Sequence, residues 1–201
     1  MPSRSPPPFD SCPRPGRRAA LRALAVTPVL PWLAAPAPAR ADAIPVRFAE
    51  LRIEEGEVLL YAEFDLAFNP TLEEALSKGV PLYFDLEFEM TRPRWYWLDE
   101  KLVQSVTTYR VSYAPLTRQY RVAIGLLQQT YATLNEVERS VSRVTSRPVA
   151  RASDLAKGVR YEAAVRLRLD VNQLPKPLQV MALASREWQL ASEWQRWSFT
   201  P

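Results

Sequence analysis

Strict two-residue alternation of apolar and polar side chains is the feature that most constrains the fold of this chain. It recurs over three segments, 57–68, 80–91 and 159–170. In the second of these, Asp85, Glu87 and Glu89 alternate with apolar residues at every even position. A period of two over ten or more residues is typical of antiparallel strands with one buried and one solvated face. A helix would scatter the same side chains around its circumference.

Turn residues predict how further strands are connected. Glu55-Gly56 predicts a tight turn that joins a strand over 46–54 to the strand over 57–68. Pro115 predicts a hairpin between 103–113 and 116–126.

The last strand is expected over 186–199. This strand would place Trp188, Leu190 and Trp194 on one face and Trp197 on the other, with a bulge near 193–195.

Two segments carry helix signals instead. Asn69-Pro70 combines an N-cap residue with a first-position proline, and the stripe of Leu72, Ala75 and Leu76 that follows ends at Gly79. Thr133 and Glu136 have the spacing of a capping box, and the apolar positions after them recur at helical intervals: Leu134, Val137, Val141 and Val144. These patterns predict a mainly β, antiparallel β-sandwich of seven or eight strands with two short connecting helices, in a single domain over 42–201.

Residues 1–41 have the layout of a secretory signal peptide. A basic region with Arg14, Arg17 and Arg18 precedes an uncharged stretch over 23–39, and Ala39-Arg40-Ala41 fits a small-x-small cleavage site. We therefore expect cleavage after Ala41 and a periplasmic or otherwise exported location. The alternatives are a disordered basic tail or an uncleaved anchor, although four prolines interrupt the apolar stretch. The segment 16–21 loosely resembles a twin-arginine signal, so the export route stays open between the two systems.

Charge and composition exclude several function classes for residues 42–201. Removing the six Arg and the one Asp of residues 1–41 leaves 20 basic and 21 acidic residues. The net positive charge of the whole chain therefore comes from residues 1–41, which we call the leader. This removes the main argument for binding nucleic acid or an anionic membrane. The chain has no His, and its one Cys, Cys12, lies in the leader. Histidine-dependent catalytic dyads and thiolate metal sites are therefore excluded from the exported part.

Glycine-rich nucleotide loops are also absent from the sequence. The four glycines after residue 41 stand far apart, the closest pair being Gly56 and Gly79. No loop can therefore bring consecutive backbone amides onto a phosphate in the way that dinucleotide and P-loops do. We expect no cofactor and no metal.

An acidic stripe is the one arrangement with catalytic geometry. Asp85, Glu87 and Glu89 share a strand face at about 7 Å intervals, which is within the separation that glycosidases use. Arginines at 160, 166 and 168 form a matching basic stripe, so cross-strand ion pairing is the favoured interpretation. A calcium site is a further alternative, but no loop has calcium-ligand spacing.

An aromatic and arginine-rich strip is the candidate binding surface. Trp95 and Trp97 would share one side of an extended chain, and Arg94 and Tyr96 the other. Arg and Tyr are enriched at protein interfaces, whereas tryptophans most often fill a core, and core packing is the favoured interpretation. The candidate patch comprises Arg92, Arg94, Trp95, Tyr96, Trp97, Trp188, Trp194 and Trp197. The segment 174–178, with two prolines, is expected to be extended, either as a rigid crossover or as a docking strip.

Four segments carry a resemblance to a known family. They are Gly79-Val80-Pro81-Leu82, Arg94-Trp95-Tyr96-Trp97, Leu174-Pro175-Lys176-Pro177-Leu178-Gln179 and Ser192-Glu193-Trp194. Together they resemble the exported bacterial family called domain of unknown function 4390, some of whose members are labelled proline-rich signal peptide protein. The resemblance implies export and a proteobacterial source, and it carries over no catalytic or binding residue. Relatives often lie beside genes for a membrane sensor kinase, which implies a role in envelope signalling.

Two functional hypotheses follow. The leading one is a non-enzymatic exported β-domain that binds an envelope protein, with a membrane sensor kinase as the candidate partner. The alternative is a carbohydrate-binding or carbohydrate-active protein that uses exposed tryptophans with the stripe of Asp85, Glu87 and Glu89. Transport of an apolar ligand between two sheets would require an internal cavity.

Overall fold

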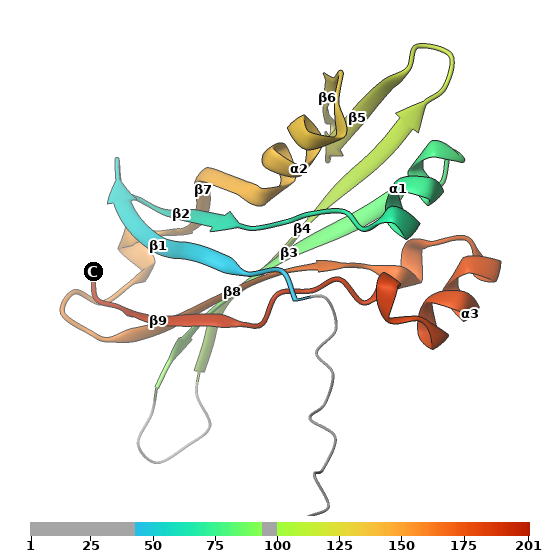
Figure 1. Cartoon of the computed structure of the whole chain (residues 1–201). Coiled ribbons are helices and arrows are strands. Elements are labelled where there is room, and N and C mark those ends of the chain that lie inside the picture. Colours follow the sequence, from blue (N-terminus) through green and yellow to red (C-terminus); the bar gives the residue numbers. More distant parts are fainter. Residues whose placement is uncertain (1–42, 94–99) are drawn as a thin grey trace, which may run out of the picture. The chain divides into compact units, whose positions relative to one another are not determined.

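The computed structural model describes residues 43–93 and 100–201 (Figure 1). The chain is mainly β. Within these ranges the strands are β1 Val46–Glu54, β2 Glu57–Phe64, β3 Leu82–Arg92, β4 Glu100–Ala114, β5 Gln119–Ile124, β6 Leu127–Tyr131, β7 Arg143–Arg151, β8 Tyr161–Leu169 and β9 Gln195–Phe199. The helices are α1 Pro70–Ser77, α2 Leu134–Ser142 and α3 Lys176–Ala184, and short 3-10 turns cover η1 Ala152–Asp154, η2 Val171–Gln173 and η3 Arg186–Trp188.

The strands form two antiparallel sheets of unequal size. The smaller sheet has the order β1-β2-β7, and the larger one has the order β6-β5-β4-β3-β8-β9. The predicted mainly β, sandwich-like fold is confirmed, with nine strands and three α-helices in the described ranges rather than seven or eight strands and two helices. The strands that the alternation did not reveal are β6, which is polar, and β7, which is irregular.

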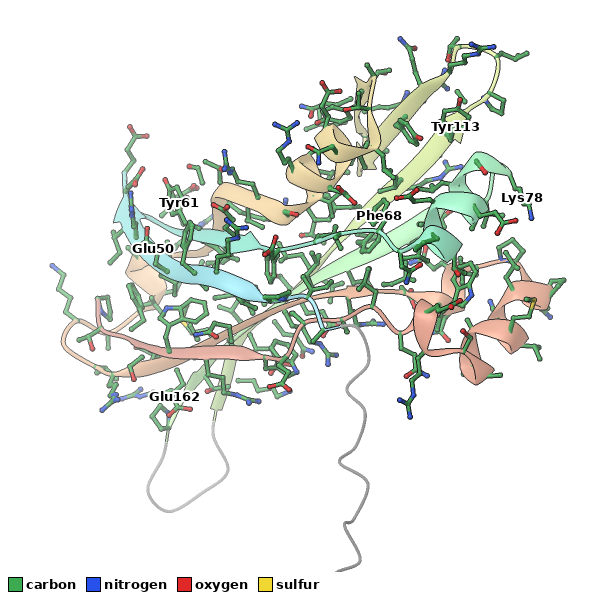
Figure 2. All side chains as sticks on the ribbon, viewed as in Figure 1. Glu50, Tyr61, Phe68, Lys78, Tyr113 and Glu162 are labelled. Atoms are coloured by element: carbon green, nitrogen blue, oxygen red, sulfur yellow. The ribbon has the colours of Figure 1, made fainter. Side chains whose placement is uncertain are left out.

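The apolar faces of both sheets meet in one hydrophobic core. The even positions from Leu82 to Met90 on β3 are at most 2 % exposed, and Val58, Leu60 and Ala62 of β2 are fully buried. Phe68, labelled in Figure 2, stacks on Phe84 with ring centroids 5.3 Å apart. Burial of each large side chain contributes roughly 1.5–3 kcal/mol, so the predicted alternation supplies most of the packing that holds the sheets together.

Both predicted helices begin at the expected caps. The Asn69 side chain accepts a hydrogen bond from the backbone N–H of Leu72, and Pro70 is the first residue of α1. At α2, the hydroxyl of Thr133 accepts from the backbone N–H of Glu136, whose carboxylate accepts in return from the backbone N–H of Thr133. Val144, predicted as part of the helical stripe, instead belongs to β7, because α2 ends at Ser142.

The structure corrects the expectation for 174–178. This segment is not extended, because α3 starts at Lys176 within it. Pro175 is the N-cap residue and Pro177 lies in the first turn, where the N–H that proline lacks has no partner inside the helix. The prolines that suggested an extended conformation therefore mark the start of a helix.

The structure also corrects the expectation for the last strand. Only Gln195–Phe199 forms a regular strand, and residues 186–188 form a 3-10 turn. Between them, Ala191 makes isolated bridges with Ala43 and Arg168. The expected bulge near 193–195 is absent because the regular strand begins there. In the described part of the chain, no helix is both long enough and apolar enough to cross a membrane.

Candidate functional site

The structure separates the members of the predicted aromatic patch. Arg94, Trp95, Tyr96 and Trp97 lie outside the described residues, and Arg92 ends β3. Trp188 is 4 % exposed in η3 and belongs to the core. The described members that remain, Trp194 and Trp197, lie on opposite faces of the larger sheet.

The surroundings of Trp194 and Trp197 show this difference. Trp194 is half-buried on the outer face of the sheet, where the guanidinium of Arg166 lies 4.6 Å from the centroid of its ring. Trp197 pairs with the fully buried Ala163 and packs against the core, where its indole N–H has no hydrogen-bond partner among residues 43–93 and 100–201. Within the described residues, the tryptophans of the predicted patch therefore do not converge on one surface.

The acidic stripe is engaged in ion pairs, as the favoured interpretation of the sequence predicted. Register places Asp85 opposite Arg168 and Glu87 opposite Arg166 on β3 and β8. Arg168 donates from Nε to Glu87 at 2.6 Å and from Nη2 to Asp85 at 3.0 Å, and Arg166 donates to Glu87 at 2.5 Å. Two members of the stripes find other partners. Arg160 donates to Ser198, and Glu89 lies 3.6 Å from Lys101.

The ionisation of Glu87 reflects this network. Burial raises the pKa of Glu87, but hydrogen bonds from Arg166 and Arg168 outweigh burial, and the pKa lies below its ordinary value. For Arg168, burial acts to lower the pKa, and the contacts with Glu87 more than offset it, so its pKa is raised. Both groups therefore stay charged. A glycosidase acid requires the opposite shift, a raised carboxyl pKa.

A large concave surface lies elsewhere, on the side of the fold where α2 connects the two sheets. Figure 1 shows α2 between β7 and the β5–β6 hairpin, and contacts join it to both. A groove of about 870 Å³ runs beside this helix. Residues 129–132 line one side, α2 and the first half of β7 line the other, and Tyr109 and Ile124 form part of the floor. We define this feature as the α2 groove.

The groove exists because the smaller sheet does not cover the whole inner face of the larger one. Leu127 pairs with Ile124, whose neighbour across the sheet is Tyr109, so all three residues are on the inner face. Even so, Leu127 is 76 % exposed, whereas Tyr109 is 4 % exposed. The inner layer therefore ends over β5, and the α2 groove occupies the space beyond its edge.

A bulge in β7 turns a cation toward this groove. On β2, Ala62 and Leu60 are two residues apart, but their partners Val144 and Arg147 are three residues apart. The extra residue changes the alternation, so that Arg147 shares the inner side with Val144. Ser146 adopts φ +52° within the bulge, a conformation that residues other than glycine rarely adopt and that recurs at functional sites.

Three arginines line the groove, and their charge is only partly compensated. Arg143 lies 3.7 Å from Glu63, and Arg139 donates to the backbone carbonyl of Asn135. Within 43–93 and 100–201, neither Arg139 nor Arg147 forms an ion pair with a carboxylate. Glu136 also lines the groove; its carboxylate accepts the backbone N–H groups of Thr133 and Ala132, and the charge of Arg139 acts on it more weakly.

The hydroxyl of Tyr109 adds a polar group to the floor. Burial raises the pKa of this phenol, and the nearby charge of Arg147 acts in the opposite direction. The Tyr109 side chain is only 4 % exposed, and its hydroxyl makes no hydrogen bond among the described residues. Because this oxygen is not among the buried unpaired atoms, it is reached from the groove, where a bound molecule could become its hydrogen-bond partner.

Sequence reasoning did not find the α2 groove. Its side chains come from β4, β5, β6, α2 and β7, and only the spacing of Arg139, Arg143 and Arg147 at intervals of four gave a signal. Within the described ranges, no group of three His, Cys, Asp or Glu side chains has an arrangement that could hold a metal ion.

A comparison with known families assigns the chain to one of them. The model of the family described as Domain of unknown function (DUF4390) matches residues 41–198. This chain belongs to the DUF4390 family. The match confirms the resemblance seen in four segments of the sequence. No curated protein and no solved structure matches this DUF4390 domain. Because the family description assigns no function, the role of the α2 groove is argued from its geometry.

Proposed function

We propose that this DUF4390 protein is exported to the bacterial envelope, where it binds another protein and catalyses no reaction. The α2 groove carries the proposal, because it combines a concave surface, three arginines and the hydroxyl of Tyr109, which has no hydrogen-bond partner among the described residues. Charged and aromatic groups at such a surface are typical of recognition sites. The acidic stripe supports the non-enzymatic part, since Glu87 is ion-paired and its pKa is lowered.

Export is supported by the layout of residues 1–41, which lie outside the described residues. The family match starts at residue 41, next to the predicted cleavage site after Ala41. N-terminal sequencing of the protein recovered from a periplasmic fraction should give a chain that begins at Asp42. A chain that keeps residues 1–41 and remains in the cytoplasmic fraction would contradict export.

Photocrosslinking in the native bacterium tests partner binding. A photoreactive residue in place of Thr130, which lines the α2 groove, should capture one discrete envelope protein. The membrane sensor kinase implied by the family resemblance is the first candidate. The matched control is the same residue in place of Glu162, an exposed position on β8 (labelled in Figure 2), which should capture none. Equal products from Thr130 and Glu162 would overturn the proposal, and no product from Thr130 would rule out the α2 groove as the binding surface.

A third position separates the two candidate surfaces. If the partner contacts the strip predicted from the sequence rather than the α2 groove, a photoreactive residue at Tyr96 should capture the protein and one at Thr130 should not. Capture from Tyr96 alone would show that the protein binds a partner through this strip and not through the α2 groove.

A further inference from the structure

We infer that the occupant of the α2 groove is an extended, acidic segment of the partner protein. This inference rests on the proposed function and names the chemistry of the segment that is recognised. Three observations carry it: the charge of the groove, the distribution of that charge along its length, and the strand edges that border it.

The charge favours an acidic ligand. Arg139, Arg143 and Arg147 line the groove, and the one carboxylate that lines it, that of Glu136, is held by two backbone N–H groups. Arg is the residue best suited to bind carboxylates, because its planar fork donates two parallel hydrogen bonds. The hydroxyl of Tyr109 supplies a further donor on the floor.

The distribution of the arginines favours a chain over a single small anion. About 6 Å of helix rise separates residues 139 and 143. Up to about 13 Å of strand separates residues 143 and 147. The backbone positions that carry the three guanidinium groups are therefore spread along the groove. An extended peptide presents alternate side chains about 7 Å apart on one side, which matches a series of carboxylates to a series of arginines.

The strand edges provide main-chain partners for such a segment. Residues 129, 130 and 131 are consecutive in β6, and all three line the groove. Side chains on one face of a strand would contribute only every second residue, so the groove borders the free edge of β6. β6 contains no proline and no charged side chain, whereas β7 on the other side contains the bulge at Ser146 and Pro148. Proline and bulges block the addition of a strand. The edge of β6 therefore accepts the backbone of the segment, and β7 and α2 supply the arginines.

Binding of labelled peptides to the mature protein purified from the periplasmic fraction tests the inference, because the six arginines of residues 1–41 would attract an acidic peptide by themselves. A nonapeptide with alternating Glu and Thr should bind, and its affinity should fall as salt is added. The counterpart with Gln in place of every Glu should bind at least about tenfold more weakly. Equal affinities for the two peptides would overturn the inference. Equally strong competition by inorganic phosphate or a single dicarboxylate would overturn it as well, because the groove would then recognise a small anion.

Matched arginine variants locate the site. Arg139→Gln, Arg143→Gln and Arg147→Gln together should reduce affinity for the Glu–Thr peptide by at least about tenfold. Arg110→Gln, Arg121→Gln and Arg196→Gln together give the same net charge at exposed positions outside the groove, and they should change affinity less than about threefold. An equal loss in both triple variants would show nonspecific attraction and overturn the inference.

Tyr109→Phe keeps the test decisive if the triple groove variant fails to fold. It removes one hydroxyl that no protein group in the described residues uses, so the melting temperature should stay within about 2 °C and the peptide affinity should fall by about threefold or more. Unchanged affinity would show that the hydroxyl of Tyr109 does not bind the peptide. If Thr130 crosslinks a partner in cells but the captured segment is not acidic, the acidic occupant is wrong and the proposed function stands. If nothing is captured, both fail.

Discussion

Arg147 of β7 lies directly opposite Leu60 of β2, a side chain that is fully buried. Residues that face each other in an antiparallel pair share a side of the sheet, so the register places a guanidinium-bearing residue on the inner side of the smaller sheet. Regular alternation from Val144 would direct Arg147 outward. The bulge around Ser146 is therefore what makes this arginine available to the α2 groove.

The backbone at Ser146 gives a first prediction. Because φ is +52° there, a glycine loses no favourable conformation, and Ser146→Gly should keep the free energy of unfolding within about 0.5 kcal/mol of its original value. Ser112→Gly in the regular strand β4 is the control and should lose about 1 kcal/mol. Urea denaturation measures both values. Equal losses would show that Ser146 does not adopt this conformation in solution.

Loss of the Glu87 charge gives a second prediction. Glu87→Gln leaves Arg166 and Arg168 without their shared carboxylate, and the free energy of unfolding should fall by about 1–3 kcal/mol, less than for a fully buried pair because both arginines are about 30 % exposed. Glu89→Gln removes only a 3.6 Å pair with an exposed lysine and should cost less than about 0.5 kcal/mol. Similar losses of unfolding free energy in the two variants would contradict the conclusion that Glu87 is the main partner of the β8 arginines.

The lowered pKa of Glu87 predicts acid sensitivity. A carboxyl whose folded pKa lies below its unfolded value of about 4.3 stabilises the fold above that value, and the contribution is lost as the pH falls through the folded pKa. Asp170 acts in the same direction. Burial raises its pKa, and hydrogen bonds from Gln173 and Asn172 outweigh burial and lower it. The melting temperature should therefore decrease as the pH is lowered below about 4.5.

Glu87→Gln is the control for this pH dependence. The variant lacks one of the contributing carboxyls, so its melting temperature should decline less steeply between about pH 5 and pH 3. Parallel curves for the variant and the original protein would contradict the assignment to Glu87.

The N-cap of α1 gives a further prediction. The Oδ1 atom of Asn69 accepts from the backbone N–H of Leu72, and its Nδ2 atom donates to the backbone carbonyl of Glu187 at 2.7 Å. Asn69→Ala removes both bonds and should lower the free energy of unfolding by about 1–2 kcal/mol. Asn69→Asp keeps the acceptor and should recover about half of that loss. Chemical denaturation of both variants provides the comparison, and equal losses would assign the whole effect to the contact with Glu187.

The sequence predicted the parts of the fold in which burial on one face determines the conformation. β2, β3 and β8 carry apolar residues at alternate positions, so their buried faces could be assigned correctly. The pairing of the acidic stripe of β3 with arginines of β8 followed from the same logic, because charges at intervals of two on neighbouring antiparallel strands meet. The helix caps were predicted because they depend on a few adjacent residues.

The remaining elements depend on tertiary context that local patterns do not contain. The polar sequence of β6 shows little alternation, and in β7 the bulge at Ser146 and the proline at 148 interrupt it. The prolines of α3 are compatible both with an extended segment and with the first turn of a helix. The α2 groove was beyond sequence reasoning for a related reason. A single inserted residue reverses the direction of Arg147, and no residue near it in the chain shows that this occurs.

The difference in size between the two sheets also affects how long the protein survives. A ligand that binds only the folded chain adds to its stability in proportion to the logarithm of its concentration. An acidic segment beside β6 would cover apolar surface that the three-stranded sheet leaves in contact with water, including Leu127. Molecules without a partner would then open more often and be degraded sooner, so the cellular amount of the protein would follow the supply of its partner.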